Sequence, residues 1–327
     1  MRILVIGDGR WAADSLMPLI NAGHEIAGVV LRNEPSDDSL GSAARGLEIK
    51  VLKPENVNTP DFVNVVTDMG VDLGLSIACN QIMKTPLLNA PLRGFVNFHA
   101  GKLPKYRGRN IINWAIINGE TEIGLTAHVV DTGIDTGDIL LQRSLPIEWT
   151  DNYGDVLERI IANFPEFVVE AVAGVELGTS GRRPQVRSAG TYFCGRVEGD
   201  EWLDWSASSL DIYNKIRGIG RPGPGARTVV GDATVNIWKA TYNTNWPKYI
   251  ATSGQVVGRG EDGVVVKTGD STILIREVDV DGGPCELPSW PIGTRLGIDL
   301  FRLVESLRSR IGELERQVLV GKNAGNI

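Results

Sequence analysis

Residues 2–31 read RILVIGDGRWAADSLMPLINAGHEIAGVVL, and this stretch decides the fold class. An apolar run at 2–7 ends in a Gly-containing turn, a helical stretch runs through Leu16 to Asn21, and a second apolar run follows at 25–31. Strand, helix and strand in this order predict a crossover unit of a parallel sheet. Because both runs are apolar throughout, we expect each strand to be covered on both faces.

The same alternation continues through the first half of the chain. Its further strand-like and helical runs lie at 61–69, 72–78, 94–99, 123–130 and about 153–175. Residues 177–190 are rich in Gly, Ser, Pro and Arg and have no apolar period, which is typical of a linker. We therefore expect an N-terminal α/β domain over residues 1–180 with a parallel sheet.

The second half has a different pattern. Short strands separated by Gly, Asp and Asn turns predict a small antiparallel barrel over 190–290, together with a helix near 208–217. The strands are expected at 234–242, 254–260, 263–269 and 272–280. An amphipathic helix is expected at 294–320. Its apolar positions recur at alternating spacings of four and three residues: Leu300, Val304, Leu307, Ile311, Leu314 and Val318. Such a face must be covered, and we expect a homodimer.

Composition limits the partners. The 327 residues carry a net charge of −7, which disfavours binding that depends on neutralising many phosphates, so no nucleic-acid partner is expected. The apolar runs are too short for a membrane span or a secretory signal, and the three cysteines show no disulfide pattern. These features predict a cytoplasmic protein that does not bind a membrane.

The turn GDGRWA at 7–12 fits the dinucleotide fingerprint, and it follows a strand and precedes a helix. The second strand, however, runs into Arg32, Asn33 and Glu34 and has no clear acidic residue for a ribose. Three interpretations stay open: a nicotinamide site of an NAD-dependent oxidoreductase, a tight turn with a purely structural role, and a site for another phosphate or polar ligand.

Asn97 and His99 alternate with period two at the end of the strand-like run 94–99, so both side chains lie on one face. An amide donor beside an imidazole suits acyl transfer to an amine, because the amide stabilises a developing oxyanion and the imidazole handles the proton. The Gly-rich turn 131–140 follows the next strand, and Asp135 or Asp138 in it is placed to orient the imidazole.

The remaining histidines do not indicate a metal site. His24 precedes a strand in a loop, and His128 lies inside the apolar run LTAHVV, where a buried, hydrogen-bonded histidine is expected. No cysteine or carboxylate cluster joins them at ligand spacing, so we expect no metal.

Four motifs in fixed order resemble the formyltetrahydrofolate-dependent formyltransferases. They are Asn97 with His99, LPKYRG at 103–108, and GIDTG at 133–137, with CNQIM at 79–83 resembling the folate-pocket loop of that family. The resemblance covers nearly the whole chain. It implies a Rossmann-like catalytic domain, a small OB-like β-barrel and a terminal helix.

The resemblance also implies a catalytic set and a donor site. Asn97, His99 and Asp135 take the catalytic positions. The co-substrate N10-formyltetrahydrofolate would lie between two loops, in contact with Gln81, Ile82, Met83, Val130, Asp131 and Ile134.

The acceptor is inferred from two departures from the tRNA-modifying members of the family. Residues 32–46 are short and acidic where those enzymes carry a basic insertion, and GKLP at 101–104 adds Lys102 to the active-site loop. The Lys102 replacement resembles the enzymes of glycan biosynthesis that formylate nucleotide-linked (UDP, dTDP or GDP) amino sugars, and the overall acidity of the chain agrees with this resemblance. We therefore expect an amino-sugar acceptor, with methionyl-tRNA as the alternative and NAD-dependent oxidation as a more distant one. The expected substrate contacts are Arg10, Trp11, Lys102, Lys105, Tyr106, Arg107, Arg109 and Asn110.

Overall fold

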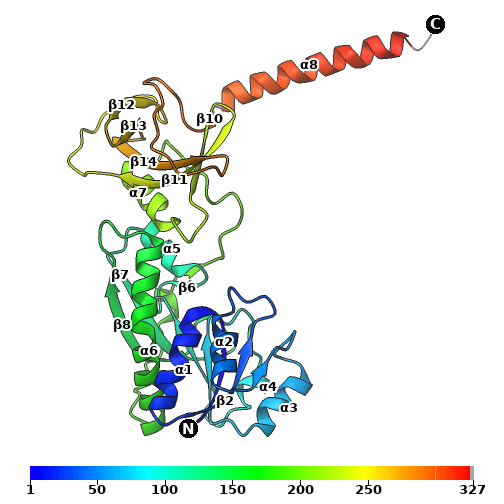
Figure 1. The fold of residues 1–327 in the computed structure, drawn as a ribbon, viewed down its shortest axis with the longest axis vertical. Coiled ribbons are helices and arrows are strands. Elements are labelled where there is room, and N and C mark those ends of the chain that lie inside the picture. Colours follow the sequence, from blue (N-terminus) through cyan, green and yellow to red (C-terminus); the bar gives the residue numbers. More distant parts are fainter. Residues whose placement is uncertain (299, 325–327) are drawn as a thin grey trace. The chain divides into compact units, whose positions relative to one another are not determined.

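The computed structural model of the chain describes residues 1–298 and 300–324 (Figure 1). These residues form two compact units. The first unit consists of Met1–Asp200 and Arg217–Gly223, and the second consists of Glu201–Ile216 and the described residues from Pro224 onward.

A seven-stranded sheet forms the centre of the first unit, in the order β3-β2-β1-β4-β5-β7-β8. The five strands from β3 to β5 run parallel, whereas β7 is antiparallel to β5 and β8 is antiparallel to β7. The strands are β1 (Arg2–Gly7), β2 (Glu25–Leu31), β3 (Val51–Leu52), β4 (Leu73–Ile77), β5 (Phe95–His99), β7 (Glu122–Val129) and β8 (Ile139–Pro146). The α/β fold class is confirmed, with two antiparallel strands at one edge of the predicted parallel sheet.

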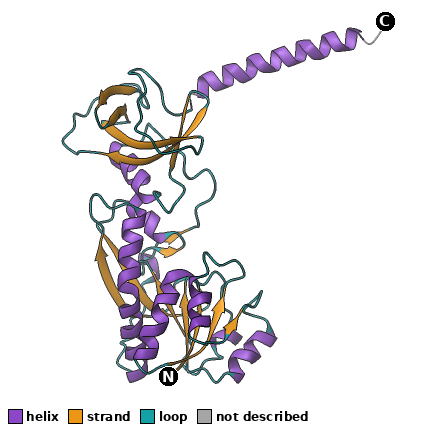
Figure 2. Cartoon of the chain, viewed as in Figure 1, coloured by secondary structure: helices purple, strands orange, loops and turns teal. Residues whose placement is uncertain are grey.

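Helices cover both faces of this sheet (Figure 2). One face packs against α1 (Gly9–Asn21), α2 (Ser39–Gly46), α5 (Ile111–Ile117) and α6 (Tyr153–Leu177). The other face packs against α3 (Pro60–Asp68) and α4 (Thr85–Leu88). Because the inner strands are covered on both sides, their residues are apolar without alternation.

Local sequence fixes the long helix α6 at both ends. At the start, Asn152 and Asp155 form a capping box, in which each side chain accepts a hydrogen bond from the other residue's backbone N–H. At the end, Gly178 adopts φ 67°, a left-handed conformation that glycine takes without a steric penalty. Phe164 and Phe167, in the middle of α6, contact Phe98 of β5 edge to face, which holds β5 against the helix.

The antiparallel direction of β7 changes where the turn after β7 lies relative to Asn97 and His99 of β5. The sequence predicts that this strand is parallel to its neighbours, which would place the turn after residue 130 beside the carboxyl end of β5. In the structure Val129 pairs with Val96 and Thr126 pairs with His99, so β7 ends beside the start of β5. That expectation is wrong, and only the length of the loop between β7 and β8 brings the turn back towards Asn97 and His99.

The second unit contains a five-stranded antiparallel sheet in the order β10-β11-β14-β13-β12. The strands are β10 (Ala226–Val230), β11 (Ala233–Thr241), β12 (Val256–Gly260), β13 (Gly263–Lys267) and β14 (Thr272–Val280). Val230 bridges to Leu296, and Gln255 bridges to Arg295, so one segment joins both edges of the sheet and closes it into a barrel. The unit also includes α7 (Ser209–Gly218, whose last two residues belong to the first unit) and α8 (Leu300–Ala324).

The barrel and the terminal helix agree with the expected fold class, while the exact domain limits stay predictions. None of the helices in the described ranges is long and apolar enough to cross a membrane.

Candidate active site

Asn97 and His99 lie on the face of β5 that is covered by α3 and α4. Phe95, two residues before Asn97, belongs to the apolar cluster on that face, and the alternation along β5 places Asn97 and His99 on the same side. His128 of β7 is directly opposite Asn97 in the strand register. The Nδ2 atom of Asn97 is 3.1 Å from Nε2 of His128, so the site contains a second imidazole.

The carboxylate of Asp135 joins these three side chains. Its Oδ1 atom lies 3.4 Å from both Asn97 Nδ2 and His128 Nε2, and its Oδ2 atom lies 3.7 Å from His99 Nδ1. The backbone N–H of Gly108 donates to Oδ2 at 2.8 Å. Asp135 has φ 53°, a left-handed conformation that is unfavourable for a non-glycine residue and must be held by its surroundings.

Charge and burial set the protonation of the cluster. Burial by itself would raise the pKa of Asp135, but His99, His128 and the Gly108 N–H together outweigh it and lower the pKa to about 2. Burial lowers the pKa of His99, and the nearby Asp135 carboxylate and the Tyr106 carbonyl only partly oppose this. At neutral pH the site therefore contains an ionised Asp135 and an uncharged His99.

The hydrogen bond to Tyr106 determines which nitrogen of His99 is basic. His99 is 8% exposed, and its Nε2 atom is 2.6 Å from the carbonyl oxygen of Tyr106. A carbonyl only accepts, so Nε2 carries the proton of the neutral ring and Nδ1 carries the lone pair. The basic nitrogen of His99 is thus the one beside Asp135.

Arg107 and Gln185 hold the Asp135 turn in place. Arg107 is 1% exposed, and its guanidinium donates to the backbone oxygen of Asp135 at 3.1 Å and to Oε1 of Gln185 at 2.7 Å. Gln185 donates in turn to the backbone oxygens of Asp135 and Gly137. The sequence predicts that Arg107 contacts the substrate, but its side chain is directed to this turn and not to solvent. Gln185 lies in the predicted linker and was not foreseen in the site.

Aromatic stacking and a two-stranded pairing fix the loop that follows β5. The short strands β6 (Arg107–Gly108) and β9 (Tyr192–Phe193) pair in parallel. The ring of Phe193 stacks on Tyr106 at 5.0 Å and on Trp114 at 5.7 Å between centroids. Tyr106 is buried and donates its hydroxyl to Glu120. The predicted contact residue Tyr106 therefore packs inside the loop.

The predicted cations of this loop differ in their partners. Lys102, Lys105 and Arg109 are all exposed, and Lys102 forms an ion pair with Glu122. Asn110 adopts a left-handed conformation before α5, and its side chain accepts a hydrogen bond from the backbone N–H of Arg196. The loop thus presents Lys105 and Arg109 to solvent around a packed interior.

The predicted donor-site residues lie on two loops that share the α3/α4 face. Met83 and Val130 both pack in the apolar cluster on this face. The Gln81 side chain holds its loop in place, because it accepts a hydrogen bond from the backbone N–H of Val57 and donates one to the Glu55 carbonyl. In the other loop, the Asp131 carboxylate accepts hydrogen bonds from the Gly133 backbone N–H and the Thr136 hydroxyl. Ile82 and Ile134 are 62% and 50% exposed. The two exposed isoleucines, on loops whose neighbouring residues share one apolar cluster, offer apolar contacts for a planar heterocycle, so these residues fit a pterin.

The side chains at the end of β1 and the start of α1 bind other residues of the protein. Asp8 is buried, accepts a hydrogen bond from Arg32 at 2.8 Å and also accepts from Ser36 N. Arg10 forms an ion pair with Glu158, and Trp11 packs edge to face on Phe164. The structure therefore gives both predicted contact residues of this loop a protein partner.

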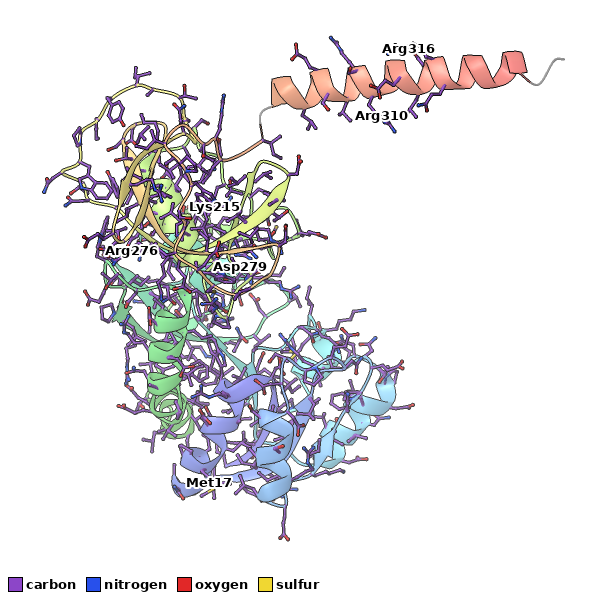
Figure 3. The ribbon with its side chains drawn as sticks, turned by 45° about the horizontal axis from the view of Figure 1, so that its top comes forward. Met17, Lys215, Arg276, Asp279, Arg310 and Arg316 are labelled. Atoms are coloured by element: carbon purple, nitrogen blue, oxygen red, sulfur yellow. The ribbon has the colours of Figure 1, made fainter. Side chains whose placement is uncertain are left out.

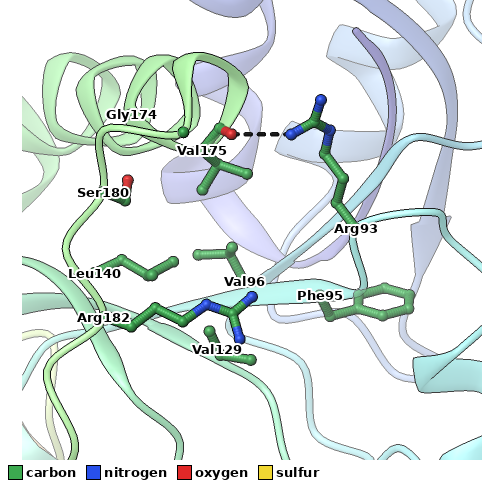
Figure 4. Close-up of a pocket in the computed structure, with 10 residues that line it drawn as sticks. Arg93, Phe95, Val96, Val129, Leu140, Gly174, Val175, Ser180 and Arg182 are labelled. Atoms are coloured by element: carbon green, nitrogen blue, oxygen red, sulfur yellow. Dashed lines mark hydrogen bonds between the residues drawn. The ribbon is translucent and has the colours of Figure 1, made fainter.

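Two cavities lie in the first unit, one at the end of α6 and one beside the turn that carries Asp135. One of about 310 Å³ opens where Arg93, Phe95 and Val96 meet the end of α6, and it is also lined by Arg182 (Figure 4). The other, of about 320 Å³, lies against the turn 131–138 and is lined by Gln185. Neither lining includes Asn97, His99 or Asp135. No group of three or more metal-ligating side chains occurs in the part of the chain that is described.

The arrangement is suited to transfer of an acyl group. Asn97 offers an amide N–H whose contact with Asp135 is long, so that hydrogen can be donated elsewhere. His99 offers an uncharged basic nitrogen, and Asp135 stabilises positive charge on that ring after a proton is taken up.

Two family models match the chain. Residues 1–172 match the model described as "Formyl transferase", and residues 197–290 match "Formyl transferase, C-terminal domain". Together these matches include Asn97, His99 and Asp135 and the five strands of the barrel.

Individual proteins are also similar. The chain is 32% identical to a methionyl-tRNA formyltransferase of Pelotomaculum thermopropionicum, in a match that covers 86% of this chain and 92% of the relative. It is 31% identical to a methionyl-tRNA formyltransferase of Geobacter sulfurreducens, over 91% of this chain and 97% of the relative. Among solved structures, WlaRD, a sugar 3N-formyl transferase in the presence of dTDP and 5-N-formyl-THF, superposes with a TM-score of 0.67. It shares 20% identity and covers 87% of this chain and 99% of its own, which shows a common fold.

Proposed function

This chain belongs to the formyl transferase family, and from that premise we propose that it transfers a formyl group from N10-formyltetrahydrofolate to the amino group of methionyl-tRNA. The observation that carries the proposal is the catalytic cluster of Asn97, His99 and Asp135, set in a chain that is 31–32% identical over most of its length to methionyl-tRNA formyltransferases.

The expected amino-sugar acceptor is wrong. The methionyl-tRNA formyltransferases are 31–32% identical to this chain, whereas the sugar formyltransferase with the same fold is only 20% identical. The expectation rested on the short acidic segment at 32–46, on Lys102 in GKLP and on the net charge of −7, which is a sum over the whole chain. Phosphate binding depends on the local field near the site, so a net negative chain can still present a local positive surface. The oxidoreductase alternative also loses its support, because residues 1–172 match the formyl transferase model.

In the proposed reaction the donor supplies an activated formyl group. Its heterocycle is held by the loop at Gln81–Met83 and the turn at Val130–Ile134, where Ile82 and Ile134 are exposed to contact it. Because the Asp135 turn is part of the same loop, donor binding and the catalytic carboxylate are coupled through one segment. Arg107 and Gln185 keep this segment in its strained conformation.

Each catalytic side chain has one task. The acceptor amine attacks the formyl carbon, and Asn97 donates its amide N–H to the oxygen on which negative charge develops. Nδ1 of His99 takes the proton that the amine loses, and the Asp135 carboxylate stabilises the resulting imidazolium. The bond between the formyl carbon and N10 then breaks, and the His99 imidazolium returns this proton to N10 as it leaves. His128 hydrogen-bonds Asn97 and keeps the amide directed to the site.

The exposed cations near the site suit an acceptor with several phosphates. Lys105 and Arg109 lie on the loop that carries the Asp135-binding Gly108 N–H, so a tRNA end that reaches the catalytic cluster passes these side chains. The proposal retains the predicted cytoplasmic location.

The test is a transfer assay with radiolabelled formyl donor and three acceptors: methionyl-tRNA, N-acetylmethionyl-tRNA and uncharged tRNA. The proposal predicts label on methionyl-tRNA alone, because only this acceptor has a free amino group on the methionine. The His99→Ala protein should lose most of this transfer while it keeps its thermal unfolding temperature. Absence of label on methionyl-tRNA, with a protein that binds the donor, would refute the proposal.

A further inference from the structure

The helix α8 has an apolar face that the rest of the described chain leaves uncovered. The helix spans Leu300–Ala324, about 37 Å at 1.5 Å per residue, and begins after residue 290, where the C-terminal family model ends. Five large apolar side chains on it are exposed by 44–54%: Leu303, Val304, Leu307, Ile311 and Leu314. An uncovered stripe of this size is unfavourable in water, so it requires a partner.

The order of residue types in the stripe indicates the partner. In heptad terms the a positions are Val304, Ile311 and Val318, and the d positions are Leu300, Leu307 and Leu314. β-branched residues at a with leucine at d favour a parallel, two-stranded coiled coil. We propose that α8 pairs with α8 of a second copy of this chain in a parallel coiled coil and so makes the protein a homodimer.

Charges beside the stripe agree with this pairing. In a parallel pair each g residue faces the e residue of the next heptad on the partner helix. Arg310 at g therefore faces Glu315 at e of the second copy, and the two chains form this attractive pair twice. Within one chain Arg310 forms an ion pair with Glu313 at 3.0 Å, and Figure 3 shows the Arg310 side chain on the surface of α8.

Gly312 does not interrupt the seam. It occupies position b, directed away from a partner helix, and a side chain built there meets no atom within 4 Å. A glycine in a helix interior costs roughly 1 kcal/mol relative to alanine, so it weakens the helix without leaving a hole in the interface. Gly312→Ala should therefore tighten the dimer.

The first experiment measures the mass of the full-length protein by sedimentation equilibrium over a concentration series. We expect a species of twice the 35.4 kDa chain mass for the wild type. Ile311→Asp places a charge in the seam and should give the 35.4 kDa monomer, while the matched control Ser309→Asp, at the outward f position, should stay dimeric. A monomeric wild type, or a dimeric Ile311→Asp protein, would overturn the proposal.

The second experiment tests the parallel arrangement. Leu314→Cys is made in a protein that also carries Cys194→Ser and Cys285→Ser, since both of these cysteines are exposed. In a parallel pair the two introduced thiols face each other across the seam, and mild oxidation should link the chains in high yield. In an antiparallel pair residue 314 faces the other end of the seam, so an uncrosslinked dimer would contradict the parallel coiled coil.

Discussion

Asp135 influences both the charge and the geometry of the catalytic cluster. Its carboxylate lies within 3.7 Å of two imidazoles and one amide, and its backbone is held in a left-handed conformation by Arg107 and Gln185. Its negative charge opposes the effect of burial on the pKa of His99. This opposition makes the pH dependence of the reaction a direct test of the pair.

We predict that Asp135→Asn moves the acidic limb of the pH profile to lower pH. Proton transfer needs unprotonated His99, so activity is present above the pKa of His99 and is lost as pH falls through it. Removal of the carboxylate removes an influence that raises this pKa, so the pKa decreases further. The plateau of kcat/KM should also fall about 10²- to 10⁴-fold. Asp131→Asn, in the same turn but without a histidine contact, is the control whose acidic limb should not move; an upward shift in Asp135→Asn would contradict the assignment.

Gly101 is the second residue whose replacement tests the site. A β-carbon at this position would lie 2.5 Å from the Tyr106 carbonyl oxygen and 2.6 Å from Nε2 of His99, so it would clash with both atoms of the hydrogen bond that fixes the tautomer. Gly101→Ala should therefore lower kcat by about tenfold or more, since overpacking typically costs a few kcal/mol. Gly46→Ala, where nothing lies within 4 Å, is the matched control and should have wild-type kcat. Equal kcat values for the two variants would disprove the role of this hydrogen bond.

For the apolar strands of the first unit, the sequence predicted where each strand lies but not the direction of every strand. The apolar runs identify β1, β2, β4, β5 and β7, because strands with two covered faces need no alternation. The period of β5 placed Asn97 and His99 on one face. The direction of β7 could not be predicted from composition, because a buried strand is equally apolar whether it runs parallel or antiparallel to the strand beside it.

The same limit applies to His128 and Gln185. The sequence indicates that His128 is buried and hydrogen-bonded, and it is. That it faces Asn97 depends on the register between β5 and β7, which the sequence does not contain. Gln185 reaches Asp135 through the pairing of the 183–193 segment with β8 and β6, and such long-range contacts have no local signal.

The loop between β5 and α5 gives a prediction at the element scale. If Lys105 and Arg109 contact tRNA phosphates, the Lys105→Ala/Arg109→Ala protein should have a higher KM for methionyl-tRNA and an unchanged KM for the donor. The slope of log KM against log salt should decrease by about 2, because each phosphate contact contributes close to one. Lys50→Ala is the control, since Lys50 is exposed just before β3, at the end of the parallel strands opposite the β5 loop. A salt slope equal to that of the wild type would exclude these two side chains as phosphate contacts.

For the whole molecule, net charge was the weakest guide to function. The chain has 40 acidic and 33 basic residues, yet the cations that matter for an acceptor are those beside the catalytic cluster. The proposed catalytic residues, the Arg107 and Gln185 side chains that hold the Asp135 turn, and the loop after β5 all lie in the first unit. The net charge, in contrast, also includes the charges of the second unit. The dimer proposed for α8 is independent of this chemistry, so Ile311→Asp should keep wild-type kcat.

One competition measurement distinguishes methionyl-tRNA from amino-sugar nucleotides as the acceptor. Methionyl-tRNA and an equimolar panel of UDP-, dTDP- and GDP-linked amino sugars are incubated together with labelled formyl donor, and the products are separated to give the ratio of kcat/KM values. We expect methionyl-tRNA to have a higher kcat/KM than every amino-sugar nucleotide in the panel. A higher kcat/KM for any one of these sugars would contradict it.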